Sequence, residues 1–121
     1  MRATALAAVL LLASCARLPD PGTLPGRYES TTAPATLALR DGQWSLDNGG
    51  FVKSGAYGIS GDRVAFLITE TSHPAFDHYC REEADVYEWR FDDDLLVLRA
   101  VGDTCDPVGQ SVLTHGPWER A

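Results

Sequence analysis

The sequence has little that would bind nucleic acid or an anionic membrane surface directly. Lys and Arg together number 10 against 17 Asp and Glu, so the formal net charge is -7. A surface of that sign repels phosphate backbones, and it offers no basic patch to anionic lipid headgroups. We therefore expect no nucleic-acid partner, and we expect any membrane attachment to come from covalent lipid.

Long apolar segments are absent as well. The run at residues 3–13 is the longest, and it is well short of the roughly 20 residues that a membrane-spanning helix needs. It directly follows Met1 and Arg2. A short apolar run behind a positively charged N-terminus is typical of a signal peptide.

Catalytic and metal-binding motifs are also missing. The three histidines, His73, His78 and His115, fit neither H-E-x-x-H nor another ligand spacing. The acidic triplet at residues 92–94 lacks the residue order of a calcium loop, and a solvated hairpin tip is the better interpretation. We expect no metal, no cofactor and no enzymatic activity.

The end of the apolar run carries the most specific motif. The segment Leu12-Ala13-Ser14-Cys15 resembles the lipobox of bacterial lipoproteins. In that family Leu stands three places before the cut, two small residues follow, and Cys is the first mature residue. The resemblance implies cleavage before Cys15 and a lipid on its thiol, which would hold the chain to a membrane.

This interpretation divides the chain into three parts. Residues 1–14 are the signal peptide, residues 15–25 are a lipidated, proline-rich tether, and residues 26–121 are the folded domain. The chain then belongs to the cell envelope, outside the cytoplasm. Ala16 after the lipidated cysteine resembles the pattern that is sorted to the outer membrane, if the host has one.

The two remaining cysteines are Cys80 and Cys105. In an exported protein, two such thiols most often form a disulfide, which would stabilise the fold by roughly 3.5 kcal/mol in the loop-entropy model. A reactive thiol or a metal ligand is the alternative, although the sequence contains no C-x-x-C.

The folded domain shows the two-residue periodicity of strands. Asp41-Gly42 separates two alternating runs and predicts a hairpin, because glycine accepts the positive φ of a type I′ turn. Only residues 74–83 could hold a helical turn or two. We expect an all-β fold, a small antiparallel up-and-down barrel of about eight strands. The expected strands span residues 26–31, 36–40, 43–47, 51–59, 64–69, 84–91, 95–101 and 111–115.

The strand at residues 84–91 has the clearest alternation. Tyr87, Trp89 and Phe91 share one face, while Glu88 and Arg90 share the other. Since a one-residue shift would bury both charges, we expect the three aromatic side chains to point into the barrel.

The order of short strands resembles the calycin group, which includes lipocalins, fatty-acid-binding proteins and small bacterial protease inhibitors. Gly26-Arg27-Tyr28 resembles the lipocalin G-x-W motif with Tyr in place of Trp, and Arg120 matches the lipocalin Arg that covers this ring. The resemblance implies a cation–π contact between Tyr28 and Arg120 that closes the barrel base. The chain departs from lipocalins because the second motif is not recognisable, no C-terminal helix is expected to follow the last strand, and the chain is short.

The aromatic residues supply the candidate ligand site. A small barrel can hold one ligand against such side chains, or the same side chains can fill its core. We expect a non-enzymatic binding module for a small apolar ligand. The alternative is a protein-interaction module, such as a small barrel protease inhibitor or an envelope partner. The candidate ligand-binding residues are Trp44, Tyr57, Phe66, Tyr87, Trp89 and Phe91.

Overall fold

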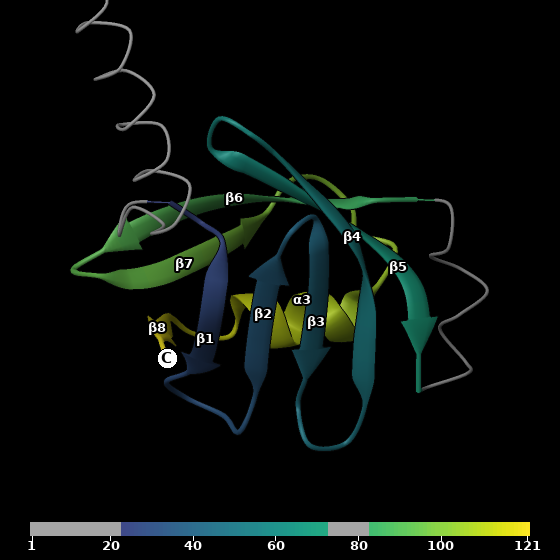
Figure 1. Cartoon of the computed structure of the whole chain (residues 1–121), viewed down its shortest axis with the longest axis horizontal. Helices are drawn as coiled ribbons and strands as arrows, with labels where there is room; N and C mark the ends of the chain where they lie inside the picture. The colour runs from purple at the N-terminus through teal and green to yellow at the C-terminus, as the bar shows by residue number, and fades with distance from the viewer. Residues whose placement is uncertain (1–22, 73–82) are drawn as a thin grey trace, which may run out of the picture.

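The computed structural model describes residues 23–72 and 83–121, which form a closed antiparallel barrel (Figure 1). Each strand pairs with the next one along the chain, and β8 pairs with β1 to complete the ring. The predicted fold class, an eight-stranded up-and-down barrel, is therefore confirmed. The strands are β1 (Gly26–Ser30), β2 (Thr36–Arg40), β3 (Gln43–Asp47), β4 (Val52–Ser60), β5 (Arg63–Thr71), β6 (Asp85–Asp92), β7 (Leu95–Ala100) and β8 (Trp118–Arg120).

Several sequence predictions fall on residues 1–22 and 73–82, which lie outside the described residues. They are the signal peptide, the lipidated Cys15, the second disulfide partner Cys80 and most of the helical turn at residues 74–83. Within the described ranges, no helix is long and apolar enough to span a bilayer.

The predicted hairpin turns are present. Asp41 and Gly42 have φ values of 52° and 78°, so both central residues of the β2–β3 turn are left-handed. The β6–β7 turn is built in the same way from Asp93 and Asp94, with φ values of 52° and 67°. Aspartate tolerates this conformation better than most residues, which explains why the acidic triplet forms a hairpin tip.

The predicted strand at residues 111–115 is wrong. The segment forms helix α3 (Pro107–Thr114), and the eighth strand begins later, at Trp118. Asp106 caps the helix by accepting a hydrogen bond from the backbone N–H of Gly109, and Pro107 occupies the first turn. This Asp-Pro start signal outweighs the weak alternation that follows it.

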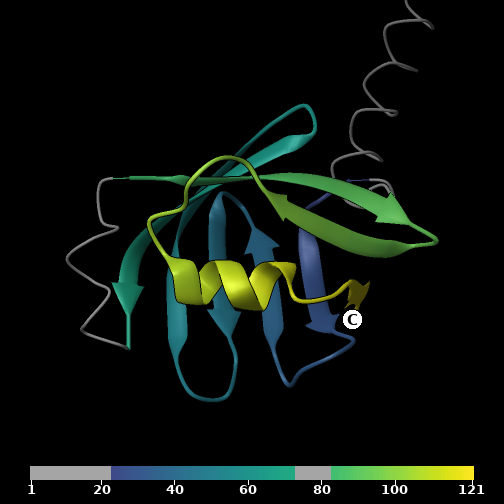
Figure 2. The same cartoon turned by 180° about the vertical axis from the view of Figure 1, so that it is seen from behind.

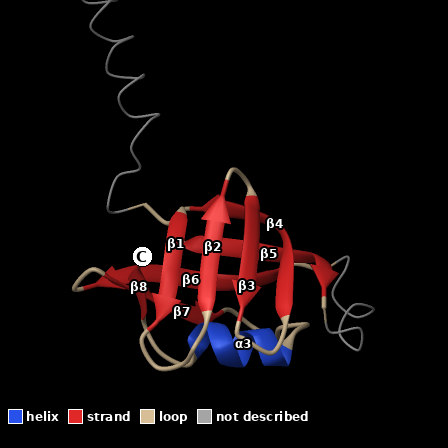
Figure 3. Ribbon diagram, turned by 60° about the horizontal axis from the view of Figure 1, so that its bottom comes forward, coloured by secondary structure: helices blue, strands red, loops and turns tan. Residues whose placement is uncertain are grey.

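Helix α3 covers one end of the barrel. Figure 2 shows it crossing the lower part of β2 to β4, and Figure 3 shows it beneath the ends of these strands. Its Leu113 is buried, and Trp118 just beyond the helix donates its indole N–H to the Leu113 carbonyl at 3.0 Å. The helix thus adds apolar residues to the core that eight short strands enclose.

The inward face of β6 is the one that the alternation predicts. Tyr87 is buried, and Trp89 and Phe91 pack against the core although both are only partly buried. Arg90 is exposed, and Glu88 is partly exposed and binds Arg99 on the neighbouring strand. The predicted face is confirmed, whereas burial is complete for Tyr87 alone.

Candidate functional site

A cluster around Arg120 joins the first and last strands, because Tyr28 on β1 and Arg120 on β8 are register partners. The Arg120 guanidinium carbon lies 5.0 Å from the ring centre of Tyr28, the pair that the lipocalin resemblance singled out. It also lies 5.5 Å from the ring centre of Phe91, a contact that the resemblance did not indicate. The two rings are 6.5 Å apart, so one cation covers two aromatic faces.

The same guanidinium holds the chain just before β1. Arg120 donates to the carbonyls of Pro25 at 3.0 Å and Thr23 at 2.8 Å, and the Tyr28 hydroxyl donates to the Leu24 carbonyl at 2.5 Å. Gly26 has a φ of 153°, a conformation that favours glycine, and a Cβ there would displace the Arg120 guanidinium from its present position. Burial raises the pKa of Tyr28, while the Arg120 charge acts in the opposite direction.

Three of the six candidate ligand-binding residues form a packed inner block. Trp44, Phe66 and Tyr87 are at most 4% exposed. The ring centres of Trp44 and Phe66 are 4.8 Å apart, and those of Phe66 and Tyr87 are 5.7 Å apart. The Trp44 indole N–H is also satisfied, because it donates to the Leu67 carbonyl at 2.9 Å. The structure thus brings these three rings against one another.

The other three candidates, Tyr57, Trp89 and Phe91, are only partly buried, and we call them the outer aromatic group. The rings of Trp89 and Phe91 meet edge to face, with their centres 6.0 Å apart. The Trp89 indole nitrogen Nε1 is buried, yet it has no hydrogen-bond partner in the described part of the chain. Buried polar groups are nearly always paired, so this donor needs an explanation.

Trp89 also borders a surface hollow of about 300 Å³. The hollow combines apolar surface with charges of both signs, and one of its walls is the ion pair in which Arg99 Nη2 contacts both Glu88 oxygens at 2.7 and 3.0 Å. Its lining residues are Asp62, Glu88, Trp89, Arg90, Val97 and Arg99. Of the six aromatic candidates, Trp89 is the one that lines it.

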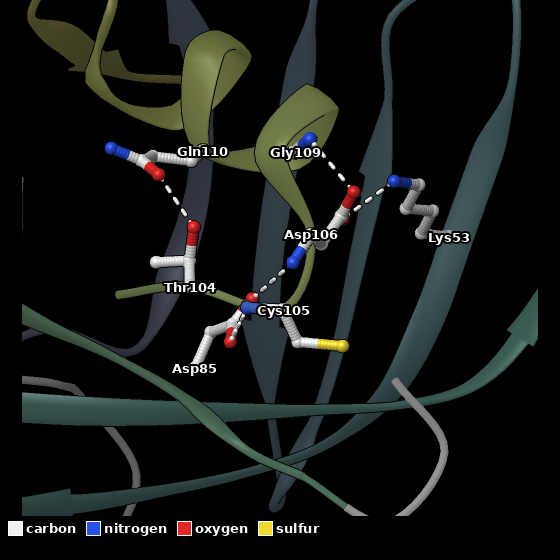
Figure 4. A network of polar contacts seen from close by, with 7 residues as sticks. All are labelled: Lys53, Asp85, Thr104, Cys105, Asp106, Gly109 and Gln110. Carbon is white, nitrogen blue, oxygen red and sulfur yellow. Dashed lines mark hydrogen bonds and ion pairs between the residues drawn. The ribbon is translucent and has the colours of Figure 1, made fainter. Parts of the chain in front are cut away.

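A polar network that the sequence analysis missed lies between β4 and α3 (Figure 4). Lys53, the only lysine in the chain, is completely buried, and its Nζ lies 2.5 Å from Asp106 Oδ2. Asp85 fixes the segment before α3, because its carboxylate accepts the backbone N–H groups of Cys105 at 2.7 Å and Asp106 at 3.1 Å. The sequence did carry one sign of this network, because Lys53 stands at an inward-facing position of a predicted strand.

The network also affects the neighbouring core. Burial raises the pKa of the Tyr87 phenol well above its ordinary value, and the charges of Asp85 and Asp106 raise it further. At the entrance of the helix, the hydroxyl of Thr104 contacts Gln110 Oε1 at 2.5 Å. The start of α3 is thus held by a connected set of polar contacts inside an apolar barrel.

The remaining predicted site residues stay predictions. Cys105 precedes the Asp106 cap, but Cys80 lies outside the described residues, so the structure does not test their disulfide. His73 and His78 lie outside as well, and His115 is exposed at the end of α3. In residues 23–72 and 83–121, no group of three or more His, Cys, Asp and Glu side chains is placed to hold a metal ion.

Comparisons with known proteins add no family. No protein-family model matches the chain, and neither a curated protein nor a solved structure matches it. The resemblance to calycins therefore rests on the barrel, on Tyr28 and on Arg120.

Proposed function

We propose that the chain is a membrane-anchored extracytoplasmic lipoprotein whose barrel is a non-enzymatic binding module for a small, largely apolar ligand. The observation that carries this proposal is the Trp89 indole N–H, which is buried beside incompletely buried aromatic rings and has no hydrogen-bond partner among residues 23–72 and 83–121. The lipid anchor is supported by Leu12-Ala13-Ser14-Cys15 alone.

An unpaired buried donor is unfavourable by about 1–3 kcal/mol, and a bound acceptor would remove that cost. The outer aromatic group offers apolar surface next to this donor. The inner block is already packed, so we place the ligand at the Trp89 end of the barrel and not among Trp44, Phe66 and Tyr87.

The Trp89 N–H specifies the polar part of the ligand. The charges of the surface hollow lie on the other face of β6 from the Trp89 ring, and Arg99 there is already bound to Glu88. The ligand therefore needs an acceptor for the indole N–H and no opposite charge. The best-fitting class is a molecule with an apolar body and one carboxyl or carbonyl oxygen, such as a fatty acid.

A fluorescent fatty acid, cis-parinaric acid, tests this proposal by titration into the purified protein. Trp89→Phe keeps an aromatic ring but removes the N–H, and we expect it to weaken binding about fivefold, which corresponds to about 1 kcal/mol. Trp44→Phe is the matched control, because that indole N–H is bound to the Leu67 carbonyl away from the site. Equal affinities for wild type and Trp89→Phe, or no binding at all, would refute the ligand proposal.

A protein-interaction module, such as a protease inhibitor or an envelope partner, is the second candidate. It is favoured by Ile59, which is 40% exposed near the tip of the β4–β5 hairpin that projects beyond the other strands in Figure 1. Inhibition of trypsin and subtilisin by the wild type but not by Ile59→Asp would support a protease inhibitor. No inhibition of either enzyme would count against it.

A further inference from the structure

We propose that Lys53 and Asp106 condense to form an intramolecular isopeptide bond between Nζ of the lysine and Cγ of the aspartate. This inference does not depend on the proposed function. It concerns a modification of the chain itself, and it would tie β4 covalently to the start of α3.

The first support is the position of the lysine. Lysines normally keep their ammonium groups in water, yet the only lysine of this chain is 0% exposed. Its partner Asp106 has a side chain that is 5% exposed, and Lys53 Nζ lies 4.7 Å from the ring centre of Phe51. Keeping two full charges in such surroundings is costly, and converting them to one neutral amide removes that cost.

The second support is the geometry of the reacting groups. Nζ is in contact with Asp106 Oδ2 at 2.5 Å, while the other oxygen, Oδ1, accepts the Gly109 backbone N–H at 3.1 Å. This N–H belongs to the first turn of α3, where the helix dipole favours negative charge. It is placed to stabilise the negative oxygen that forms when an amine attacks the carboxyl carbon.

The reaction balances within the pair. A proton passes from Nζ to Oδ2 along their hydrogen bond, which leaves an amine and a carboxylic acid. The amine attacks Cγ, the N–C bond forms, and the C–Oδ2 bond breaks. Oδ2 leaves as water with that proton and a second one from the nitrogen. Oδ1 becomes the amide oxygen and continues to accept the Gly109 N–H, so the helix cap is retained.

Two neighbouring residues, Asp85 and Gly109, help to position the Asp106 carboxyl group beside Lys53. Asp85 accepts the backbone N–H of Asp106 and therefore acts as a positioning residue. Gly109 leaves room for the carboxyl group, because a Cβ at this residue would overlap Oδ2. Held this way in a buried site, an amine and a carboxyl group react as if at very high concentration.

Peptide mapping tests the bond directly. The full chain is purified, incubated, unfolded, reduced, alkylated and digested with trypsin, which does not cleave at an acylated lysine. We expect a branched species in which residues 41–63 and 100–120 are joined with the loss of one water molecule. Separate peptides 41–53, 54–63 and 100–120, without the branched species, would overturn the proposal.

Amine labelling of the unfolded wild type gives an independent result that needs no variant. Because there is one lysine, an unreacted chain carries one ε-amine, and a condensed chain carries none. Labelling of Lys53 in most molecules would contradict the bond.

Variants separate the proposed chemistry from nonspecific crosslinking. Lys53→Arg and Asp106→Ala should both yield only unbranched peptides, and a branch that persists in either would refute the assignment. Asp85→Asn keeps both reacting groups and should slow branch formation at least severalfold while the circular dichroism spectrum remains that of a β fold. An unchanged rate in Asp85→Asn would exclude the positioning role.

Discussion

Gly55 lies at the irregularity in β4 where the pairing with β5 shifts register between Ser54 and Gly55. A Cβ at this residue would overlap the Leu67 carbonyl oxygen, and it would lie 2.9 Å from both the Leu67 carbonyl carbon and the Thr69 nitrogen. These are backbone atoms of the neighbouring strand, so no side chain can rotate away. Gly55→Ala must therefore push β4 and β5 apart or abolish the bulge.

We expect Gly55→Ala to lower the free energy of unfolding by about 3 kcal/mol, the upper end of what overpacking usually costs. For a domain of this size, that loss corresponds to a fall in Tm of roughly 12–24 °C. The free energy of unfolding of such a domain is about 5–15 kcal/mol in total, so the variant would retain only part of it. Thermal and urea unfolding followed by circular dichroism measure the change.

Gly58→Ala is the matched control on the same strand. A Cβ at Gly58 meets nothing within 4 Å, and the residue is exposed. We expect a change within about 1 kcal/mol in either direction, since alanine also restricts the unfolded chain. Equal stabilities of Gly55→Ala and Gly58→Ala would refute the account of the bulge.

Three further predictions concern the anchor, the cysteines and the core phenol. Cys15→Ser should move the chain from the membrane fraction to the soluble fraction and remove its lipid mass; retention of the variant on membranes would contradict the lipobox assignment. Cys80 and Cys105 should not react with a thiol reagent in the unfolded, unreduced protein, and labelling of either one would exclude the disulfide. Because burial and the charge of Asp85 raise the pKa of Tyr87, the fold favours the neutral phenol, and stability should fall as pH rises above the ordinary tyrosine value of about 10. Tyr87→Phe should lessen that alkaline loss in urea titrations, and an identical pH dependence would show that Tyr87 does not cause it.

The sequence by itself determined the first seven strands, the hairpin turns and the barrel, whereas it misplaced the eighth strand. The alternation in β6 and the Asp41-Gly42 turn are local patterns, and each of them restricts the backbone within a few residues. A chain of short hairpins without crossover helices can close only by pairing its last strand with its first. The contact between Tyr28 and Arg120 was predicted from a family resemblance and not from any local pattern.

The alternation of residues 111–115 did not reveal that this segment forms a helix. Residues 111–115 are compatible with a strand, but Asp106 and Pro107 start a helix just before them. Leu113 then reaches the core from this helix. Helix α3 packs beside β7, and the core that Leu113 joins is formed by residues from strands far apart in the sequence.

Only the tertiary structure decided how the candidate residues are grouped. It divided six aromatic side chains into a packed inner block and a partly buried outer group, although all six lie on barrel strands with alternating patterns. It also placed Lys53 against Asp106, which is 53 residues away along the chain. Sequence periodicity specifies which face of a strand a side chain occupies, whereas the side chain it meets there depends on strand order, register and the path of α3.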